Sequence, residues 1–241
     1  MENNLVISLT TIPSRINKIE DCIKSLLNQS IPVKIELWIP KIGIRDGKKI
    51  EKIPPFLLND NIIIYYIDDI GSISKIYFSL TKHLNDKDFI IISVDDDVKY
   101  PKNFVEKLLE YHKLYPNAAL CYRGRKILNN NLDYNNIKLF KSNEITKIQE
   151  IDIITGTWGV LYKNNFFTKD FFNLEQDKIL KLTDDIVISA HMKKNNIKSY
   201  VIPSKEEFIP IEAHKINALW ELNKDGKNNN YTINYFKKLF L

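Results

Sequence analysis

Three consecutive carboxylates, Asp95, Asp96 and Asp97, directly follow an apolar run rich in β-branched residues at positions 89–94. Such a run is typical of a strand buried on both faces. Burying adjacent carboxylates without partners would cost far more than one lost hydrogen bond, so a positive group is expected nearby. A divalent cation takes oxygen ligands, and open α/β sheets bind ligands beyond the carboxyl ends of their strands. The pattern predicts a metal site; the alternative is a solvated acidic turn before the helix that follows Pro101.

A second acidic pair, Asp184 and Asp185, stands before an apolar segment at positions 186–192. Thr183 or Asp184 is a suitable N-cap, and the helix dipole favours carboxylates in a first helical turn. The pair therefore predicts the start of a helix. Two hypotheses remain for the pair. Either it only caps the helix and interacts with the helix dipole, or it supplies a carboxylate that takes part in a reaction.

Three further segments have the composition of ligand-binding loops. Residues 10–15 follow a short apolar run and contain Pro13, which discourages helix in the residue before it. Asp68 and Asp69 end another apolar run just before Gly71, where an Asx turn is the structural alternative. Two glycines flank Thr157 and Trp158 in the segment 156–159, which predicts a tight turn or a close approach to a ligand.

In the first half of the chain, predicted strands and helices alternate between these candidate site residues. We predict strands at 5–9, 33–39, 62–67 and 89–94, helices at 16–28, 75–83 and 103–115, and a polar surface excursion at 41–55. The alternation is typical of a mostly parallel sheet with right-handed crossovers. Three of the four strands end in polar or acidic loops, which should gather along one edge and accept a ligand of nucleotide size.

The second half of the chain is less regular. Its apolar runs predict strands at 118–122, 151–155, 160–162 and 199–202, whereas residues 123–150 are rich in Asn and Lys and indicate loop or edge structure. No repeat or linker divides the chain. We therefore expect one α/β domain with two lobes, residues 1–101 and 102–241.

The amino-acid composition and the net charge limit the kinds of protein that this chain can be. The 241 residues are 44% hydrophobic and 11% aromatic, as in globular proteins rather than disordered ones. The net charge is +5 with dispersed lysines, so we predict no nucleic-acid binding. Cys22 and Cys121 have no metal-ligand spacing and are expected to be core thiols of a reducing compartment. With no signal peptide or apolar run of about 18 residues, we expect a cytoplasmic protein, at most peripheral to a membrane.

Taken together, the motifs resemble those of the GT-A glycosyltransferases, particularly small bacterial and viral members. The resemblance covers about residues 5–202 and rests on five motifs in the same order. They are Ser8-Leu9-Thr10-Thr11-Ile12-Pro13-Ser14-Arg15, Asp69-Ile70-Gly71-Ser72-Ile73-Ser74-Lys75, Asp95-Asp96-Asp97, Gly156-Thr157-Trp158-Gly159 and Asp184-Asp185. Each motif alone is weak, but their order on the expected elements is specific. The resemblance implies a GT-A fold with a nucleotide-sugar lobe, residues 1–101, and an acceptor lobe, residues 102–241.

The resemblance also implies roles for single residues. The nucleotide sugar would contact Thr10, Thr11, Pro13 and Arg15, with Asp69 at the base or ribose, Lys75 at the diphosphate, and Asp95 and Asp96 beside the donor. Asp95 and Asp97 would form the Asp-x-Asp pair that holds a divalent metal, Mn²⁺ or Mg²⁺, with His214 as a further candidate ligand. Gly156, Thr157 and Trp158 would lie on the acceptor side. The pair Asp184-Asp185 would supply the base, with Asp185 preferred because Asp184 is placed to cap the helix.

The implied chemistry agrees with these residue types. A nucleoside diphosphate leaves readily only when its developing charge is neutralised, which a cation and Lys75 would do. An acceptor hydroxyl needs a carboxylate within hydrogen-bond reach to take its proton. The expected partners are a UDP-sugar, with a GDP-sugar second, and a glycan or glycoconjugate acceptor. The alternatives are a sugar-phosphate nucleotidyltransferase, which usually has a Gly-rich loop after the first strand, and a non-catalytic nucleotide-sugar-binding module.

Overall fold

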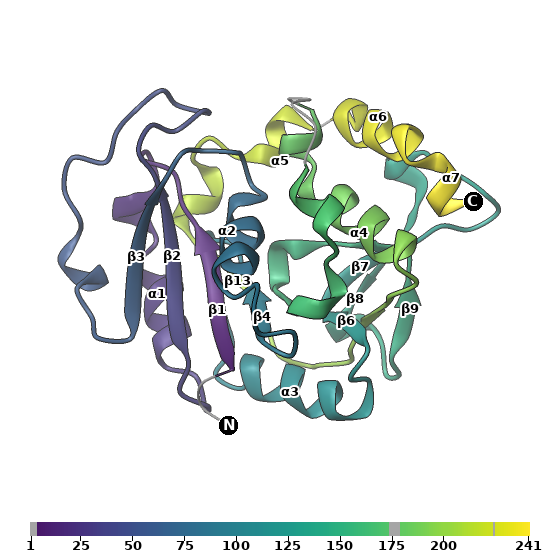
Figure 1. The fold of residues 1–241 in the computed structure, drawn as a ribbon, viewed down its shortest axis with the longest axis horizontal. Helices are drawn as coiled ribbons and strands as arrows, with labels where there is room; N and C mark the ends of the chain where they lie inside the picture. Colours follow the sequence, from purple (N-terminus) through teal and green to yellow (C-terminus); the bar gives the residue numbers. More distant parts are fainter. Residues whose placement is uncertain (1–3, 174–178, 224) are drawn as a thin grey trace.

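A sheet of eight strands forms the centre of the protein, in the computed structural model that describes residues 4–173, 179–223 and 225–241. The strand order is β3-β2-β1-β4-β11-β6-β12-β9, of which the first four strands are labelled in Figure 1. In chain order the strands are β1 (Leu5–Thr10), β2 (Lys34–Pro40), β3 (Ile62–Ile67), β4 (Ile90–Ser93), β6 (Ala118–Cys121), β9 (Gln149–Ile151), β11 (Val160–Lys163) and β12 (Lys198–Val201). Strands β1 to β4 pair in parallel, as do β6 and β12, whereas β11 and β9 are antiparallel to their neighbours. The predicted mostly parallel α/β sheet is confirmed.

The order of the first four strands determines where a ligand can bind. The chain moves outward from β1 to β2 and β3, and then returns to the other side of β1 as β4. The connections after β1 and β4 therefore leave in opposite directions, which opens a crevice beyond their carboxyl ends. The loop after Thr10 and the three aspartates after Val94 both start at this crevice.

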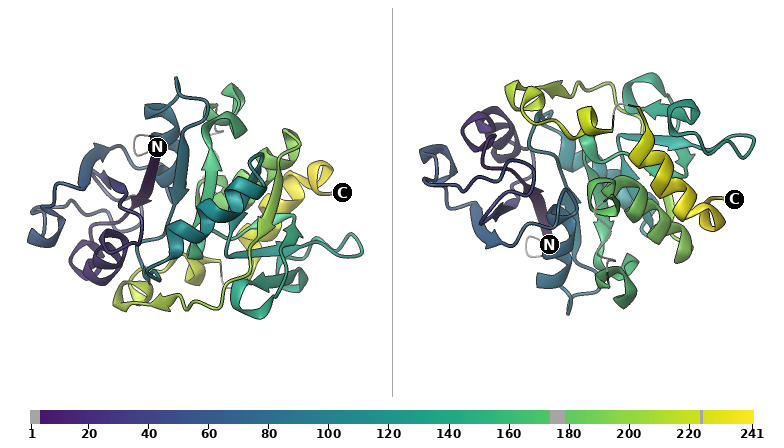
Figure 2. Two further views of the ribbon diagram at one scale, coloured as in Figure 1. Left: turned by 90° about the horizontal axis from the view of Figure 1, so that it is seen from below. Right: turned by 90° about the horizontal axis from the view of Figure 1, so that it is seen from above.

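Helices cover both faces of the sheet (Figure 1, Figure 2). Helices α1 (Glu20–Leu27) and α3 (Phe104–Leu114) pack on one face, and α2 (Ser74–Lys82) and α4 (Asp184–Lys194) pack on the other. Strand β1 shows why, because alternate side chains of a strand point to opposite faces. Its Ile7 and Leu9 enter the α1–α3 core, whereas Val6 enters the α2–α4 core. The result is a three-layer α/β/α arrangement that holds the crevice rigidly.

The second lobe contains structure that the sequence analysis did not predict. Residues 123–150, expected to be loop or edge, hold β7 (Arg123–Lys126) and β8 (Lys138–Lys141), which form a small sheet with β10 (Ile153–Ile154). The polar side chains obscured this pairing, which depends on backbone hydrogen bonds between distant segments. Two short strands, β5 (Val98–Lys99) and β13 (Ile209–Pro210), also pair.

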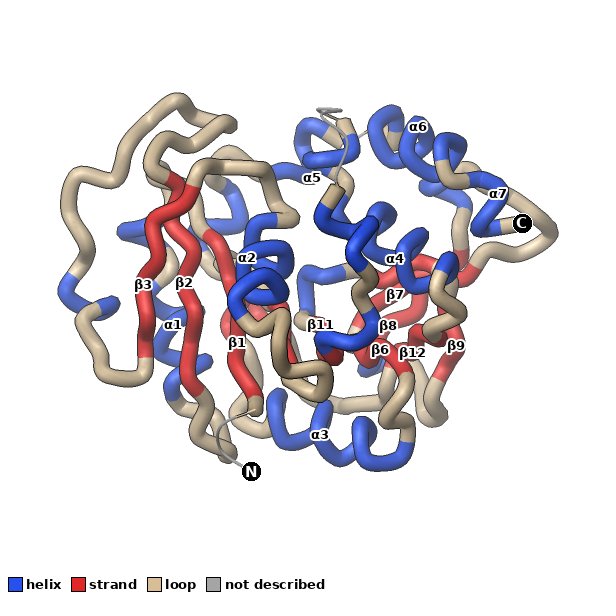
Figure 3. Tube along the Cα trace, in the orientation of Figure 1, coloured by secondary structure: helices blue, strands red, loops and turns tan. Residues whose placement is uncertain are grey.

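The C-terminal segment folds back over the second lobe. Helices α6 (Lys227–Tyr235) and α7 (Lys237–Phe240) cover the outer side of α4, and the short helix α5 (Leu219–Leu222) precedes them (Figure 3). Ile186 and Ala190 of α4 pack there against Ile233 and Phe240. Because α4 is covered by the sheet on one side and by these helices on the other, its first turn is held in place at the crevice.

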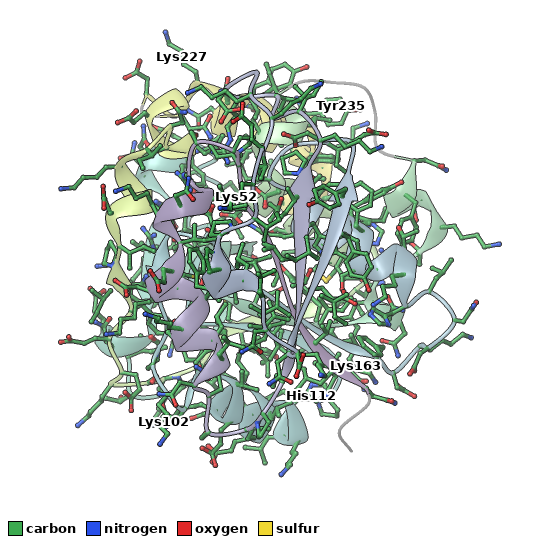
Figure 4. All side chains as sticks on the ribbon, turned by 90° about the vertical axis from the view of Figure 1, so that its left-hand side faces the viewer. Lys52, Lys102, His112, Lys163, Lys227 and Tyr235 are labelled. Atoms are coloured by element: carbon green, nitrogen blue, oxygen red, sulfur yellow. The ribbon has the colours of Figure 1, made fainter. Side chains whose placement is uncertain are left out.

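Most element boundaries agree with the sequence patterns to within one or two residues. Strand β3 has the predicted limits, whereas the helix predicted at 16–28 is divided into a 3-10 turn, Ile16–Lys18, and α1. Cys22 and Cys121 are buried free thiols. Lysines lie on distant parts of the surface; Lys227 and Lys102 project at the top and the bottom of Figure 4. In the described parts of the chain, no helix is long and apolar enough to cross a membrane.

Candidate active site

A cavity of about 510 Å³ opens at the carboxyl ends of β1 and β4. The predicted site residues that line it are Thr10, Arg15, Lys75, Asp95, Asp96, Asp97, Thr157, Asp184, Asp185 and His214. The predicted residues that do not line it are Thr11, Pro13, Asp69, Gly156 and Trp158. The two acidic clusters, which are about ninety residues apart in sequence, therefore share one cavity, whereas five residues assigned to the ligand stand outside its lining.

The antiparallel strand β11 brings the glycine-flanked turn to this cavity. Val160 at the start of β11 pairs with Ser93 at the end of β4, so the residues before β11 lie beside those after β4. The hydroxyl of Tyr100 accepts the N–H of Asp95 at 3.0 Å and lies 3.4 Å from the carbonyl oxygen of Thr157. A Cβ atom on Gly156 would lie 3.0 Å from Asp185 Oδ1, so a side chain here would require the Asp185 carboxylate to shift.

Protein groups hold the central aspartate of the triple cluster. The Arg15 guanidinium donates to Asp96 at 2.7 Å and lies 3.4 Å from Asp97, while the Thr11 hydroxyl donates to the other oxygen of Asp96 at 2.6 Å. The Arg15 Nε atom donates to the carbonyl oxygen of Ile216 at 2.7 Å. Arg15 was assigned to the phosphates, and here it neutralises the acidic cluster and ties it to the C-terminal segment. Thr11 likewise stabilises Asp96 through its hydrogen bond, although Thr11 itself does not line the cavity.

Lys75 joins the two acidic clusters. Its Nζ atom lies 2.6 Å from Asp95 Oδ1 and 3.0 Å from Asp184 Oδ2, and its side chain is 6% exposed. The hydroxyl of Ser72 donates to the other oxygen of Asp184 at 2.6 Å. The prediction that Asp184 caps its helix is wrong, because Asp184 is the first residue of α4 and follows Thr183 at the N-cap position. Its carboxylate is directed across the cavity to α2 instead.

The environments of Asp184 and Asp185 push their pKa values apart. Burial opposes ionisation of both, but the Lys75 ammonium and the Ser72 hydroxyl hold the pKa of Asp184 below its usual value. Burial and the negative charge of Asp184 raise the pKa of Asp185 to about 7, against the smaller effects of Lys75 and the Gly156 N–H. That N–H donates to Asp185 Oδ1 at 2.9 Å. Such a separation of neighbouring carboxylates is typical of an acid–base site, in which the group with a pKa near neutrality exchanges the proton.

The triple cluster offers oxygen ligands of the kind that a divalent cation prefers. Asp97 Oδ1 is buried without a hydrogen-bond partner, and burial with the charges of Asp95 and Asp96 raises the pKa of Asp97 to about 6. His214 Nδ1 lies 3.1 Å from the other oxygen, Asp97 Oδ2. Within residues 4–173, 179–223 and 225–241, no three His, Cys, Asp or Glu side chains converge as a ligand set. Two carboxylates fit an ion whose coordination is completed by substrate phosphates and water, as is usual for Mg²⁺.

Two residues outside the cavity lining have clear structural contacts. The Asp69 carboxylate accepts the N–H groups of Gly71 at 2.8 Å and Ile44 at 2.9 Å, which makes it the anchor of a turn. Trp158 stacks on Phe208 with ring centroids 4.9 Å apart. The Gly71 contact is the Asx turn that was the structural alternative for Asp69. The contacts of Asp69 with Ile44 and of Trp158 with Phe208 were not visible in the sequence, because each joins segments whose proximity depends on the complete fold.

Several cavity residues were not among the predicted site residues, and four of them carry an arginine or tyrosine side chain: Arg45, Arg123, Arg125 and Tyr134. Arg45 lies in the polar excursion, and the other three lie in the stretch predicted as loop or edge. The alternation Arg123-Gly124-Arg125 is a weak period-two signal that could have indicated a strand with both arginines on one face.

We expect Arg15→Met to lower the free energy of unfolding by about 3–5 kcal/mol, because it leaves buried carboxylates without their cation. Denaturant unfolding measures this change. Lys18→Met is the matched control, since Lys18 forms an exposed pair with Glu212 and should change stability by less than about 1 kcal/mol. Equal losses in the two variants would show that Arg15 does not stabilise the acidic cluster.

No protein-family model matches the chain, and no curated protein matches it in sequence. Among solved structures, residues 1–349 of S. aureus TarS in complex with UDP match with a TM-score of 0.53 and 13% identity, over 85% of this chain and 59% of that one. A further S. aureus TarS structure matches with a TM-score of 0.52 and 14% identity, over 91% of this chain and 40% of that one.

The chain spans less than two thirds of either TarS chain, and at this identity the likeness concerns the fold. The protein has the GT-A fold of the glycosyltransferases.

Proposed function

We propose that the protein is a metal-dependent glycosyltransferase that moves a sugar from a nucleoside-diphosphate sugar, preferably a UDP-sugar, to a hydroxyl of a glycan or another acceptor. The observation that carries this proposal is the single cavity in which Lys75 joins the acidic cluster after β4 to the pair that opens α4. The UDP bound to TarS, a protein of the same fold, supports the choice of nucleotide.

Each cluster has its own task in this reaction. A divalent cation held by Asp95 and Asp97 would supply positive charge against the developing charge of the leaving diphosphate. Lys75, with its pKa raised well above the usual value by the carboxylates around it despite burial, stays protonated and adds a second positive group. Asp185, whose pKa is about 7, takes the proton of the acceptor hydroxyl. Asp96, held by Arg15 and Thr11, keeps the loop between the two metal carboxylates in position.

The proposal predicts UDP binding that depends on Mn²⁺ and on both outer aspartates. Asp95→Asn or Asp97→Asn should weaken Mn²⁺-dependent UDP binding by at least the 10–100-fold typical for partners of metal ligands. Calorimetry with and without Mn²⁺ measures this effect. Asp88→Asn is the matched control, because Asp88 precedes β4 at its far end and pairs with Lys163 on the surface. Unchanged UDP binding in both cluster variants would overturn the proposed metal site.

The preferred nucleotide is tested separately. Donor hydrolysis with UDP-, GDP-, CMP- and dTDP-sugars should be fastest with a UDP-sugar and second fastest with a GDP-sugar. Activity with only a CMP- or dTDP-sugar would refute the preference for UDP while leaving a sugar transferase in place.

A further inference from the structure

The small sheet of the second lobe presents two arginines to the cavity. In β7, Gly124 faces the main sheet, where an added Cβ atom would lie 2.2 Å from Ile151 Cδ1. Arg123 and Arg125 therefore share the opposite face of the strand, and both line the cavity. The glycine lets β7 approach closely enough for this presentation.

Neither arginine has an acidic partner in the part of the chain that the structure describes. The nearby Asp152 accepts Lys126 at 3.3 Å and also Lys193, and Glu144 pairs with Lys141 at 2.7 Å. Asp152 and Glu144 are thus paired with lysines, and neither arginine forms an ion pair with them.

The two side chains differ in the contacts that they make with the rest of the protein. Arg125 Nη1 donates to the carbonyl oxygens of Tyr134 at 3.2 Å and Ile137 at 3.0 Å, and its guanidinium lies 4.3 Å from the centre of the Tyr134 ring. Arg123 is 6.0 Å from the Trp158 ring centre and makes no ion pair or side-chain hydrogen bond with the described residues. The Nε atoms of both arginines are buried without a partner.

Holding two adjacent, partly buried guanidinium groups together is energetically unfavourable when no anion is bound. Burial lowers the pKa of Arg123, and the adjacent charge of Arg125 lowers it further, although Tyr134 and Asp185 act in the other direction. A guanidinium fork binds carboxylate or phosphate through two parallel hydrogen bonds, and the negative charge of the anion would offset the repulsion between the two arginines.

The electrostatic partners of Arg123 differ from those of Arg45, another arginine that lines the cavity. Arg45 interacts electrostatically with Arg15 and with the carboxylates after β4, whereas Arg123 interacts with Tyr134, Arg125, Asp185 and Glu144. Arg123 is therefore close enough to interact with the proposed base, where the transferred sugar and the acceptor would meet.

We propose that Arg123 and Arg125, beside Tyr134, form an anion subsite for a carboxylate or phosphate group carried by the transferred sugar or by the acceptor. The inference rests on the proposed function and extends it, since it assigns an acidic substrate to the same cavity. The subsite acts in addition to the groups that hold the diphosphate.

Two calorimetric arms distinguish the source of the anion. In the donor arm, UDP-glucuronic acid and UDP-glucose are compared in the presence of Mn²⁺. In the acceptor arm, protein saturated with UDP and Mn²⁺ is titrated with glucose 6-phosphate, glucuronate and glucose. In one of the two arms, the wild type should bind the anionic compound about 10–100-fold more tightly than the neutral one, and Arg123→Gln should remove that preference. The arm that responds identifies the source.

Controls separate this inference from the proposed function and from misfolding. UDP binding should persist in Arg123→Gln; if that variant does not fold, Arg123→Lys, which keeps the charge but loses the fork, should reduce the preference partly. Lys138→Gln removes the same charge from an exposed position of the same sheet and should leave the preference intact. Equal binding of anionic and neutral compounds in both arms, with UDP bound, would overturn the subsite alone. No UDP binding by the wild type would overturn the proposed function and the subsite with it.

Discussion

Replacing Asp185 by asparagine is expected to reduce the rate of sugar transfer by about 10²–10⁴-fold, the usual contribution of a general base, while UDP binding changes little. Asp185 lies in the cavity and accepts the Gly156 N–H, so an asparagine fits without a new cavity or clash. In the proposed function the other cluster holds the donor, and for this reason the loss should appear in kcat at saturating UDP-sugar. Single-turnover transfer and calorimetry with UDP together measure the two effects.

The pH dependence of transfer should reflect the same carboxyl. The base must be ionised to accept a proton, and its pKa is raised to about 7, so kcat/KM should increase with pH through about 7 and then level off. The charged groups that interact with it are Asp184, Asp95, Lys75 and Arg123, and the neutral titratable groups are Tyr134, Tyr162 and Cys121. Because the folded-state pKa lies above the ordinary value of 3.8, the contribution of Asp185 to stability is largest below pH 4 and is lost as the pH rises through about 7.

A matched control exists on another helix. Asp21 lies in the first turn of α1, as Asp185 does in α4, but it is exposed and does not line the cavity. Asp21→Asn should leave transfer and its pH profile unchanged. Full transfer activity in Asp185→Asn would exclude Asp185 as the base, and the same loss in Asp21→Asn would indicate a general effect of charge.

Replacing Lys75 by methionine is expected to lower kcat by about 10²–10³-fold and to destabilise the fold by about 3–5 kcal/mol. The stability effect follows from the two carboxylates, Asp95 and Asp184, that lose their shared cation. The catalytic effect follows from the missing positive charge beside the leaving diphosphate. Steady-state kinetics at saturating donor and denaturant unfolding measure the two effects.

The control for this variant is on the same helix. Lys82 ends α2 and pairs with Glu36, and it does not line the cavity. Lys82→Met removes the same charge and should leave kcat near the wild-type value even if stability falls. Wild-type turnover by Lys75→Met would remove Lys75 from the reaction and leave it a structural role alone.

The amino-acid sequence by itself determined the main elements and the two acidic clusters. Residues 62–67 and 89–94 are apolar, β-branched and bounded by polar breaks, so their strand character is a local property that survives in the fold as β3 and β4. Asp95–Asp97 follow one strand directly, and the connectivity of a parallel sheet places that end at its ligand-binding edge. These conclusions needed only neighbouring residues and general rules of α/β topology.

Only the tertiary structure decided which partner each charged group has. Lys75 and Arg15 were both assigned to the diphosphate, but the fold places Lys75 between Asp95 and Asp184 and Arg15 against Asp96. It also directs Asp184 to Ser72 rather than to its own helix, and it brings Arg123 to the cavity from a stretch with only a weak local signal. The physical reason is that an ion pair depends on distance in space. Strand order and the antiparallel entry of β11 set those distances, and neither can be obtained from the spacing of residues along the chain.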